Sequence, residues 1–146
     1  MTTLRDAKTS EPLAADYRPS DSEPFMNERQ QAYFRQKLVA WKDEILEESR
    51  STIAALRQDT VALPDDADRA TSETDRAIEL RTRDRQRKLI AKIEAALRRL
   101  DEGEYGYCEE TGEPISLSRL EARPIATMSI EAQERHERRE RVHRDD

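Results

Sequence analysis

The sequence predicts a mainly α-helical protein built around a long antiparallel helical hairpin, a coiled coil with an acidic tip. Two long runs of helix-forming residues are separated by Pro64, and the acids Asp65, Asp66 and Asp68 follow that proline. Proline ends a helix because it lacks an N–H group and its ring clashes with the preceding turn. Acids favour the start of the next helix, where free N–H groups and the helix dipole attract negative charge.

The composition favours long exposed helices over a compact globule. The 146 residues are 40% charged, 35% hydrophobic and only 5% aromatic, and this length suffices for one modest domain. The net charge of −6 disfavours general nucleic-acid binding, because phosphate neutralisation needs clustered lysines and arginines. We therefore expect a protein partner and no sequence-specific DNA binding. We also expect a monomer that does not associate with a membrane.

Cysteine usage and the N-terminus indicate the compartment. Cys108 is the single cysteine, so an intrachain disulfide is impossible and a reducing compartment is expected. No apolar stretch approaches the ~18 residues of a membrane span. The N-terminal part lacks a secretory-type apolar core, and Asp6, Glu11 and Asp16 argue against a transit peptide. These features predict a cytoplasmic protein.

The chain divides into four segments. Residues 1–26 are polar, contain three prolines and are expected to be partly disordered. Residues 27–101 form the predicted hairpin with its tip near 64–70, and Asn27 with Gln30 resembles a capping box. Both helices carry apolar residues at spacings of four, three and four, which is typical of a coiled-coil seam. These residues are Phe34, Leu38, Trp41 and Ile45 in the first helix, and Leu89, Ile93, Ala96 and Leu100 in the second.

The middle of the second helix is densely charged. One interpretation is a solvated face with pairs between residues i and i+4. The other is a positive flank that touches a large acidic partner or a phosphate ligand. The cations are Arg76, Arg81, Arg83, Arg85, Arg87, Lys88 and Lys92, with Asp75, Glu79 and Asp84 between them.

Residues 102–130 predict a small knuckle, and residues 131–146 a C-terminal helix. Gly103 suits the left-handed conformation that ends helices, and the turn residues that follow indicate the knuckle. Leu117 to Ala122 is expected to be a short helix or a turn, closed by Arg123 and Pro124. On the last helix His136 and His143 share one face, where solvated surface histidines are expected rather than metal ligands.

The knuckle has the spacing of a zinc ribbon without its ligands. Cys108, Thr111, Ser129 and Ala132 form two X-x2-X pairs seventeen residues apart. Four cysteines in this frame would be a strong zinc signature, but one thiolate does not hold a tetrahedral zinc. We therefore expect a zinc-ribbon-like region with no metal and no other cofactor. Its apolar core is expected to comprise Tyr107, Ile115, Leu120, Ile125, Met128 and Ile130.

Taken together, several segments resemble the DksA/TraR family of bacterial RNA polymerase secondary-channel factors. The combination is specific, whereas any single piece is not. The matching residues are Tyr33-Phe34-Arg35 through Trp41, Pro64-Asp65 with Asp68-Arg69-Ala70, Glu79-Leu80-Arg81 with Arg83-Asp84-Arg85, Arg87-Lys88-Leu89-Ile90, Gly106-Tyr107-Cys108-Glu109, and Arg119-Leu120-Glu121-Ala122-Arg123-Pro124.

The resemblance implies a coiled coil that inserts through the polymerase secondary channel and brings its tip near the catalytic magnesium. Such a factor destabilises open promoter complexes. It acts with the alarmone ppGpp in the stringent response, lowering ribosomal RNA transcription and raising that of amino-acid biosynthetic promoters. Asp65, Asp68 and Ala70 match the family's tip motif, and carboxylates three residues apart share one helix face.

The resemblance also implies a ppGpp site shared with polymerase. Leu89, Lys92 and Arg123 match contributing positions, and the cations can pair with phosphate. A further basic position of that site is Gln133 here. A stand-alone enzyme is not expected, because this chain has no nucleophile with a base, no phosphate-binding loop and no complete metal-ligand set.

Two other functions remain open from the sequence. A Gre-type transcript-cleavage factor also carries acids at a coiled-coil tip, where they help to hold a second magnesium for RNA hydrolysis. A coiled-coil adaptor without polymerase activity would use the same acids only as helix caps.

Overall fold

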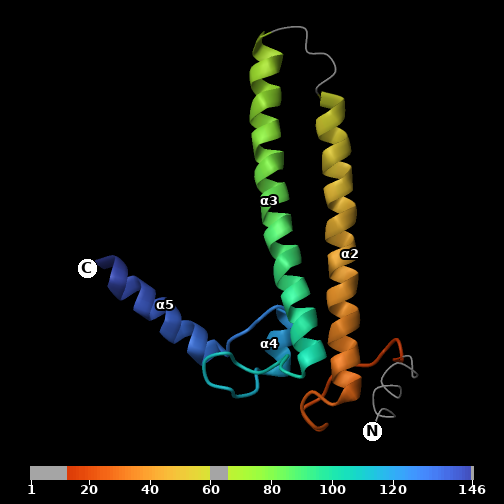
Figure 1. Cartoon of the computed structure of the whole chain (residues 1–146), viewed down its shortest axis with the longest axis vertical. Coiled ribbons are helices and arrows are strands. Elements are labelled where there is room, and N and C mark those ends of the chain that lie inside the picture. The colour runs from red at the N-terminus through yellow and green to blue at the C-terminus, as the bar shows by residue number, and fades with distance from the viewer. Residues whose placement is uncertain (1–12, 60–65, 146) are drawn as a thin grey trace. The chain divides into compact units, whose positions relative to one another are not determined.

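In a computed structural model of the chain, the structure describes residues 13–59 and 66–145. The side chains at 56, 58, 59, 66–68, 144 and 145 are not described. The described chain forms four helices, α2 (Glu28–Asp59), α3 (Asp66–Glu102), α4 (Leu117–Ala122) and α5 (Ile130–Asp145) (Figure 1). In these ranges there is no β-strand, only an isolated bridge between Tyr107 and Pro114. No described helix is both long and apolar enough to cross a membrane.

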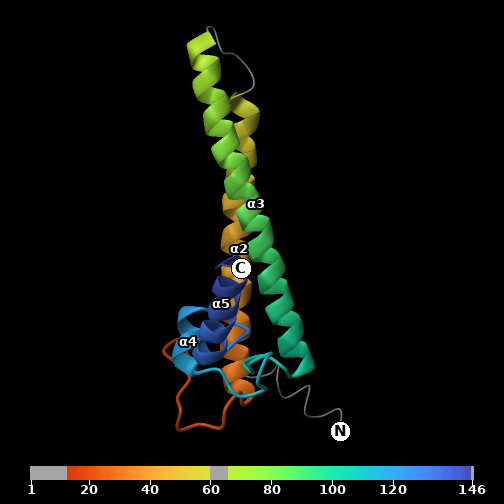
Figure 2. The same ribbon diagram turned by 90° about the vertical axis from the view of Figure 1, so that its left-hand side faces the viewer.

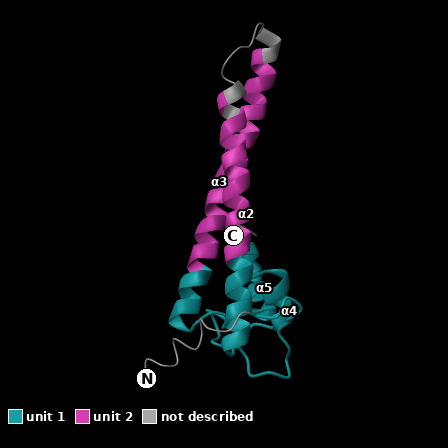
Figure 3. Cartoon of the chain, turned by 90° about the vertical axis from the view of Figure 1, so that its right-hand side faces the viewer, with its two compact units in different colours: residues 1–38, 96–146 teal, residues 39–95 magenta. Residues whose placement is uncertain are grey.

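The chain separates into two compact units (Figure 3). One comprises residues 1–38 and 96–146, and the other residues 39–95. We call them the knuckle unit and the hairpin unit. The mainly helical architecture agrees with the predicted fold class, because both long helices lie where the two apolar repeats predicted them.

In the hairpin unit, α2 and α3 run antiparallel (Figure 1), and in the view turned by 90° α3 passes in front of α2 (Figure 2). The Nζ atom of Lys42 lies 3.2 Å from the Glu94 carboxylate, and Gln86 donates a hydrogen bond of 3.4 Å to Glu48. Ile45 and Ile93 are 4% and 0% exposed, which confirms that these seam positions are buried.

Farther from these buried positions, the hairpin carries half-buried residues of both kinds. No residue described within 46–59 or 66–88 is buried. Leu46 and Ile53 are half-buried, and so are Arg76, Glu79 and Gln86. Glu79 Oε2 and Gln86 Oε1 are shielded from solvent and have no hydrogen-bond partner among the described atoms. Among the described residues, full apolar burial in the hairpin unit is therefore confined to the end near Ile45 and Ile93.

The knuckle unit has its own apolar core. The Phe34 ring packs 5.5 Å from the ring of Tyr105, which is 4% exposed. The predicted core residues Ile115 and Leu120 are fully buried, whereas Tyr107, Ile125 and Met128 are only half-buried. The remaining buried residues of this unit include Leu38, Ala96, Leu100, Leu117, Ala126 and Ala132.

The prediction that Ile130 belongs to this core is wrong. Ile130 is 49% exposed, while Ala132, two residues farther along, is fully buried. The reason is the phase of α5: successive helical residues are rotated by about 100°, so residues 130 and 132 face nearly opposite sides. Ala132 takes the inward position, and Ile130 faces outward.

At the start of α2, the side chains of Asn27 and Gln30 accept hydrogen bonds from backbone N–H groups. The Gln30 N–H donates to Asn27 Oδ1 at 2.9 Å, which confirms Asn27 as the N-cap. Gln30 is fully buried, and its Oε1 accepts the N–H of Met26 at 2.7 Å. Its Nε2 donates to the Ser20 carbonyl at 3.2 Å. Gln30 therefore also fixes the segment that precedes the helix.

The Phe25 and Met26 side chains of this segment pack against the backbone of Gly106 in the knuckle. Met26 has a φ of 52° and Gly106 a φ of 90°. A Cβ atom on Gly106 would lie 3.1 Å from Met26 Cε and 3.2 Å from the Phe25 ring. The Phe25 and Tyr107 rings meet edge to face at 5.4 Å. Gly106 therefore serves both an unusual backbone conformation and a tight approach.

Candidate functional site

The predicted tip is only partly described. Asp65 lies outside the described residues. Asp68 belongs to the first turns of α3, but its side chain is not described. Ala70 is exposed on α3, and its carbonyl accepts the Thr74 hydroxyl at 3.0 Å. The shared direction of the two carboxylates therefore stays a prediction.

A continuous basic face runs along α3 in the hairpin unit. Arg81, Arg85, Lys88 and Lys92 are exposed and follow one another at spacings of four, three and four, so they lie on one side of the helix. We call these four residues the basic face. None of them makes an ion pair within the described part of the chain.

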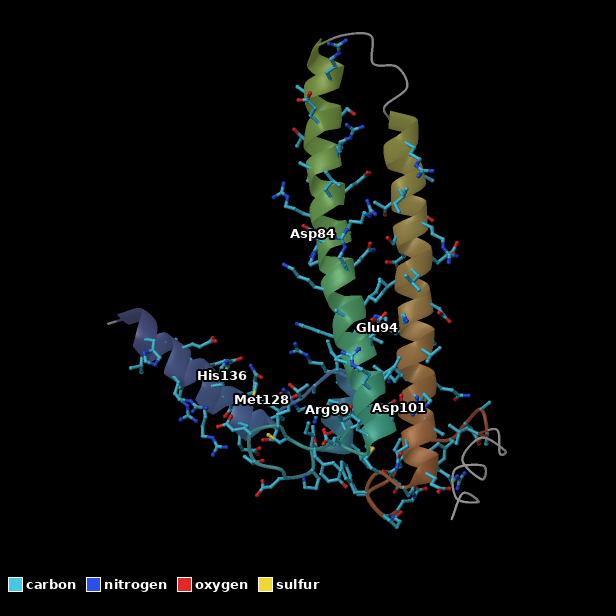
Figure 4. All side chains as sticks on the ribbon, in the orientation of Figure 1. Asp84, Glu94, Arg99, Asp101, Met128 and His136 are labelled. Carbon is cyan, nitrogen blue, oxygen red and sulfur yellow. The ribbon has the colours of Figure 1, made fainter. Side chains whose placement is uncertain are left out.

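The neighbouring cations are hardly neutralised. Among the seven cations from Arg76 to Lys92, only Arg87 pairs with a described acid, Asp84, at 4.0 Å on another side of α3 (Figure 4). A face laced with pairs between i and i+4 is therefore not what the helix presents. The uncompensated charge favours the second interpretation, a surface for an acidic partner or a phosphate ligand.

The residues expected to contact ppGpp are divided between the hairpin unit and the knuckle unit. Leu89 is half-buried and Lys92 exposed on α3 of the hairpin unit. Arg123 is the C-cap residue of α4 in the knuckle unit and is exposed. Gln133 is half-buried on α5, and its amide donates to Glu137 at 3.1 Å.

A cluster of polar side chains joins three segments of the knuckle unit beside α4. Glu121 Oε1 accepts hydrogen bonds from the Tyr33 hydroxyl and from Lys37 Nζ, the latter at 3.2 Å. The Arg18 guanidinium donates to the Tyr33 hydroxyl at 3.0 Å and lies 3.8 Å from Glu121. Burial, followed by the hydrogen bond to Glu121, raises the pKa of Tyr33. Sequence reasoning missed this cluster, because its hydrogen bonds join residues that are 15 to 88 positions apart.

The zinc-like frame converges on the Cys108 sulfur, which is 3% exposed. Burial raises the pKa of this thiol, but hydrogen bonds outweigh that effect and lower the pKa to about 7. The donors are the Thr111 hydroxyl and the backbone N–H groups of Ser129, Thr111 and Glu110. The structure thus brings three of the four frame positions together around one sulfur.

These residues do not fit zinc. One thiol, two hydroxyls and the methyl group of Ala132 replace the four thiolates or imidazoles of a structural site. The Ser129 hydroxyl is already engaged, since it accepts the Ala132 N–H at 3.2 Å at the start of α5. No group of three His, Cys, Asp or Glu side chains suited to a metal occurs in the described ranges.

Protein hydrogen bonds hold the knuckle instead. Arg99, near the end of α3, forms an ion pair with Glu109 and donates to the Tyr107 carbonyl at 2.8 Å (Figure 4). Arg119 Nε donates to the Met128 carbonyl at 2.9 Å, and the Glu109 N–H to the Thr127 carbonyl at 2.8 Å.

His136, expected at the surface, is exposed and pairs with Glu140 at 3.1 Å.

Comparison with known proteins matches both parts of the chain. Residues 30–100 match the family described as DnaK suppressor protein DksA, N-terminal domain. Residues 103–138 match the prokaryotic dksA/traR C4-type zinc finger, although Cys108 is the only cysteine in this chain.

Curated relatives cover nearly the whole chain. The RNA polymerase-binding transcription factor DksA of Caulobacter vibrioides is 74% identical over 132 residues, which are 90% of this chain and 93% of the relative. The factor of the same name from Escherichia coli K12 is 41% identical over 125 residues, or 86% and 83% of the two chains.

A solved structure shares the fold. Transcription factor DksA2 from Pseudomonas aeruginosa superposes with a TM-score of 0.77 at 44% identity, covering 85% of this chain and 94% of the other. The antiparallel helices and the knuckle with its zinc-finger frame agree with the two family matches, and the sequence similarity extends over nearly the whole chain. The chain therefore belongs to the DksA family.

Proposed function

We propose that this chain is a transcription factor that binds bacterial RNA polymerase through its secondary channel, destabilises open promoter complexes and acts with ppGpp in the stringent response. One observation carries the proposal: a relative named as an RNA polymerase-binding transcription factor is 74% identical over 90% of the chain. A factor of this kind acts through binding and is not itself an enzyme. Its place is the cytoplasm, where polymerase transcribes.

The basic face supports an electrostatic contact with polymerase. Four exposed cations without ion-pair partners in the described chain attract an acidic surface and raise the rate of encounter. Lys92 belongs to this face. With Leu89 and Arg123 it is proposed to contact ppGpp on polymerase, where cations pair with phosphate. Gln133 leaves that contact with one cation fewer than the family pattern.

The tip acids are proposed as the element that acts on the polymerase active site. Asp65 and Asp68 are three residues apart, a spacing that puts two helical side chains on one face. Carboxylates can approach a hard cation through water or accept hydrogen bonds from a mobile protein segment. Ala70 keeps the surface next to them small.

The proposed factor works as a monomer without zinc. The donor set around Cys108 does not fit the metal, and Arg99 and Arg119 hold the knuckle by hydrogen bonds to backbone carbonyls. The proposed effector is ppGpp, and no further cofactor or direct reading of DNA sequence is needed.

Multi-round transcription from a ribosomal RNA promoter with the cognate polymerase tests the function. Wild type is expected to inhibit, more strongly with ppGpp. Asp68→Asn is expected to lose inhibition while still binding polymerase, and Asp75→Asn, which changes an exposed acid elsewhere on α3, is expected to behave like wild type. No inhibition by wild type would contradict the proposal. Shortening of RNA in backtracked complexes would assign transcript cleavage instead.

A further inference from the structure

Arg123 combines a free guanidinium with a firmly held backbone. Its side chain is exposed and forms no ion pair in the described part of the knuckle unit. Its N–H donates to the Arg119 carbonyl at 2.7 Å, and its own carbonyl accepts the Ala126 N–H at 3.0 Å. A cation on a fixed backbone loses less conformational freedom when it binds an anion than one on a mobile loop.

Two side chains hold the carbonyl groups on either side of Arg123. Lys37, on α2, donates from Nζ to the Glu121 carbonyl at 2.9 Å. The Tyr105 hydroxyl donates to the Pro124 carbonyl at 2.7 Å, and Tyr105 is 4% exposed. Since α4 has only six residues, these bonds, rather than helix length, fix the direction in which the chain leaves it.

Lys37 also holds the carboxylate of Glu121, two residues before Arg123. Its Nζ lies 3.2 Å from Glu121 Oε1, the atom that also accepts the Tyr33 hydroxyl. Arg18 lies 3.8 Å from the same oxygen. Lys37 thus holds the end of α4 through both the backbone carbonyl and the side chain of Glu121.

We propose that Lys37 is a positioning residue that keeps the Arg123 backbone fixed, and that it thereby sets the ppGpp concentration at which the factor responds. This inference rests on the proposed function, in which Arg123 meets the phosphates of ppGpp. Lys37 acts through Glu121 and the backbone and does not contact the ligand. The cluster of Lys37, Glu121 and Tyr33 is therefore part of the regulation of this surface.

Amide hydrogen exchange of the free protein tests the positioning without polymerase. Lys37→Met keeps much of the aliphatic stem but removes both hydrogen bonds. Exchange at the N–H groups of Arg123 and Ala126 is expected to become about five- to tenfold faster, because local opening costs less. Lys42→Met is the matched control: Lys42 also pairs with an acid at 3.2 Å, and its side chain is 30% exposed against 34% for Lys37. Unchanged exchange at Arg123 in Lys37→Met would overturn the inference.

A ppGpp titration of promoter inhibition tests the consequence. Lys37→Met is expected to raise the half-maximal ppGpp concentration about fivefold or more while leaving inhibition at saturating ppGpp in place. Lys42→Met should give the wild-type midpoint, and Lys37→Arg, which keeps charge and donors, should restore most of the response. An unchanged midpoint in Lys37→Met, with a responsive wild type, would overturn the inference.

A double-mutant cycle separates positioning from direct contact. In an Arg123→Ala background, Lys37→Met should produce no additional shift of the midpoint, because its effect passes through Arg123. An additive shift would mean that Lys37 binds the ligand itself and would contradict the proposal. If wild type does not inhibit transcription with or without ppGpp, the proposed function fails, and the exchange measurement still decides whether Lys37 holds Arg123.

Discussion

The guanidinium of Arg99 donates a hydrogen bond of 2.8 Å to the carbonyl oxygen of Tyr107. The same group donates to the Glu104 carbonyl at 3.2 Å and pairs with the Glu109 carboxylate. One side chain from the last turns of α3 thus holds three points of the loop that leads into the zinc-like frame. Two of these points, Tyr107 and Glu109, flank Cys108, the first position of that frame.

Replacing Arg99 should therefore destabilise the knuckle unit. Arg99→Met removes hydrogen bonds to two carbonyls and one ion pair, and its side chain is only 17% exposed. We expect a loss of about 1–3 kcal/mol in the free energy of unfolding, measured by urea denaturation. Arg98→Met is the control on the same helix, since Arg98 is exposed. Equal stability of the two variants would contradict the role of Arg99.

Removal of metal should leave the fold unchanged. The purified protein is expected to contain substoichiometric zinc by elemental analysis, because one thiol does not complete a tetrahedral site. Its thermal midpoint should be the same with and without a strong chelator. A midpoint that falls on chelation would mean that ligands other than the four frame positions bind a metal.

Burial predicts very different costs for truncating two apolar residues of the knuckle unit, Leu120 on α4 and Ile130 on α5. Leu120→Ala removes a fully buried side chain and should cost about 2–5 kcal/mol of unfolding free energy. Ile130→Ala changes a residue that is 49% exposed, and its effect should stay within about 0.5 kcal/mol. Denaturant melts of both variants check the difference, and a large loss in Ile130→Ala would place that residue in the core after all.

The segment before α2 should respond to pH through Tyr17 and Glu23. Tyr17 donates to Glu23 at 2.6 Å and is 9% exposed. Burial, followed by the bond to Glu23, raises the Tyr17 pKa to about 12, while the bond from Tyr17 lowers the pKa of Glu23. The Tyr17 contribution to stability is thus complete below pH 10 and is lost as pH rises toward about 12. The Glu23 contribution is complete above its ordinary pKa of 4.5 and is lost at lower pH.

Tyr17→Phe makes this pH dependence measurable. Its difference in unfolding free energy from wild type should be constant from about pH 5 to about pH 9 and shrink above that range. Ultraviolet titration should show one tyrosinate fewer at high pH in the variant. A difference that grows with rising pH would contradict the assigned sign.

The basic face of α3 gives a test by charge reversal. Arg85→Glu places a negative charge among Arg81, Lys88 and Lys92 and should weaken polymerase binding about tenfold or more at low salt. Arg87→Glu is the control, since Arg87 lies on another side of α3 and pairs with Asp84. Fluorescence anisotropy with labelled protein measures both affinities. Equal losses would indicate a general charge effect rather than a defined face.

The helices were predictable because their signal is local. Phe34, Leu38 and Ile45 recur at the period of a coiled coil, and all three are buried. Asn27 located the start of α2. Each of these signals depends on residues within one or two turns of each other, so the sequence alone carries it.

The contacts of the knuckle unit were not predictable in the same way. Gln30 is fully buried because Met26, Ser20 and Glu23 satisfy its amide, yet polar residues are usually exposed. Tyr105 is the tyrosine of a Glu-Tyr-Gly turn, yet it is buried, and its hydroxyl donates to the Pro124 carbonyl. Such pairings depend on tertiary structure. The basic face is an intermediate case. Its charges were evident from the sequence, but only the structure shows that they have no ion-pair partner in the described part of the chain.

The lack of buried side chains in the first half of α3 has a consequence for proteolysis. Residues 69–88 of α3 carry many arginines and no buried side chain, so local opening of this stretch exposes little apolar surface and costs little free energy. Trypsin should therefore cleave first after arginines such as Arg76 and Arg81 and only later near Ile93, which is fully buried. A partner that covers this stretch would protect it, and the order of cleavage sites would then report its footprint.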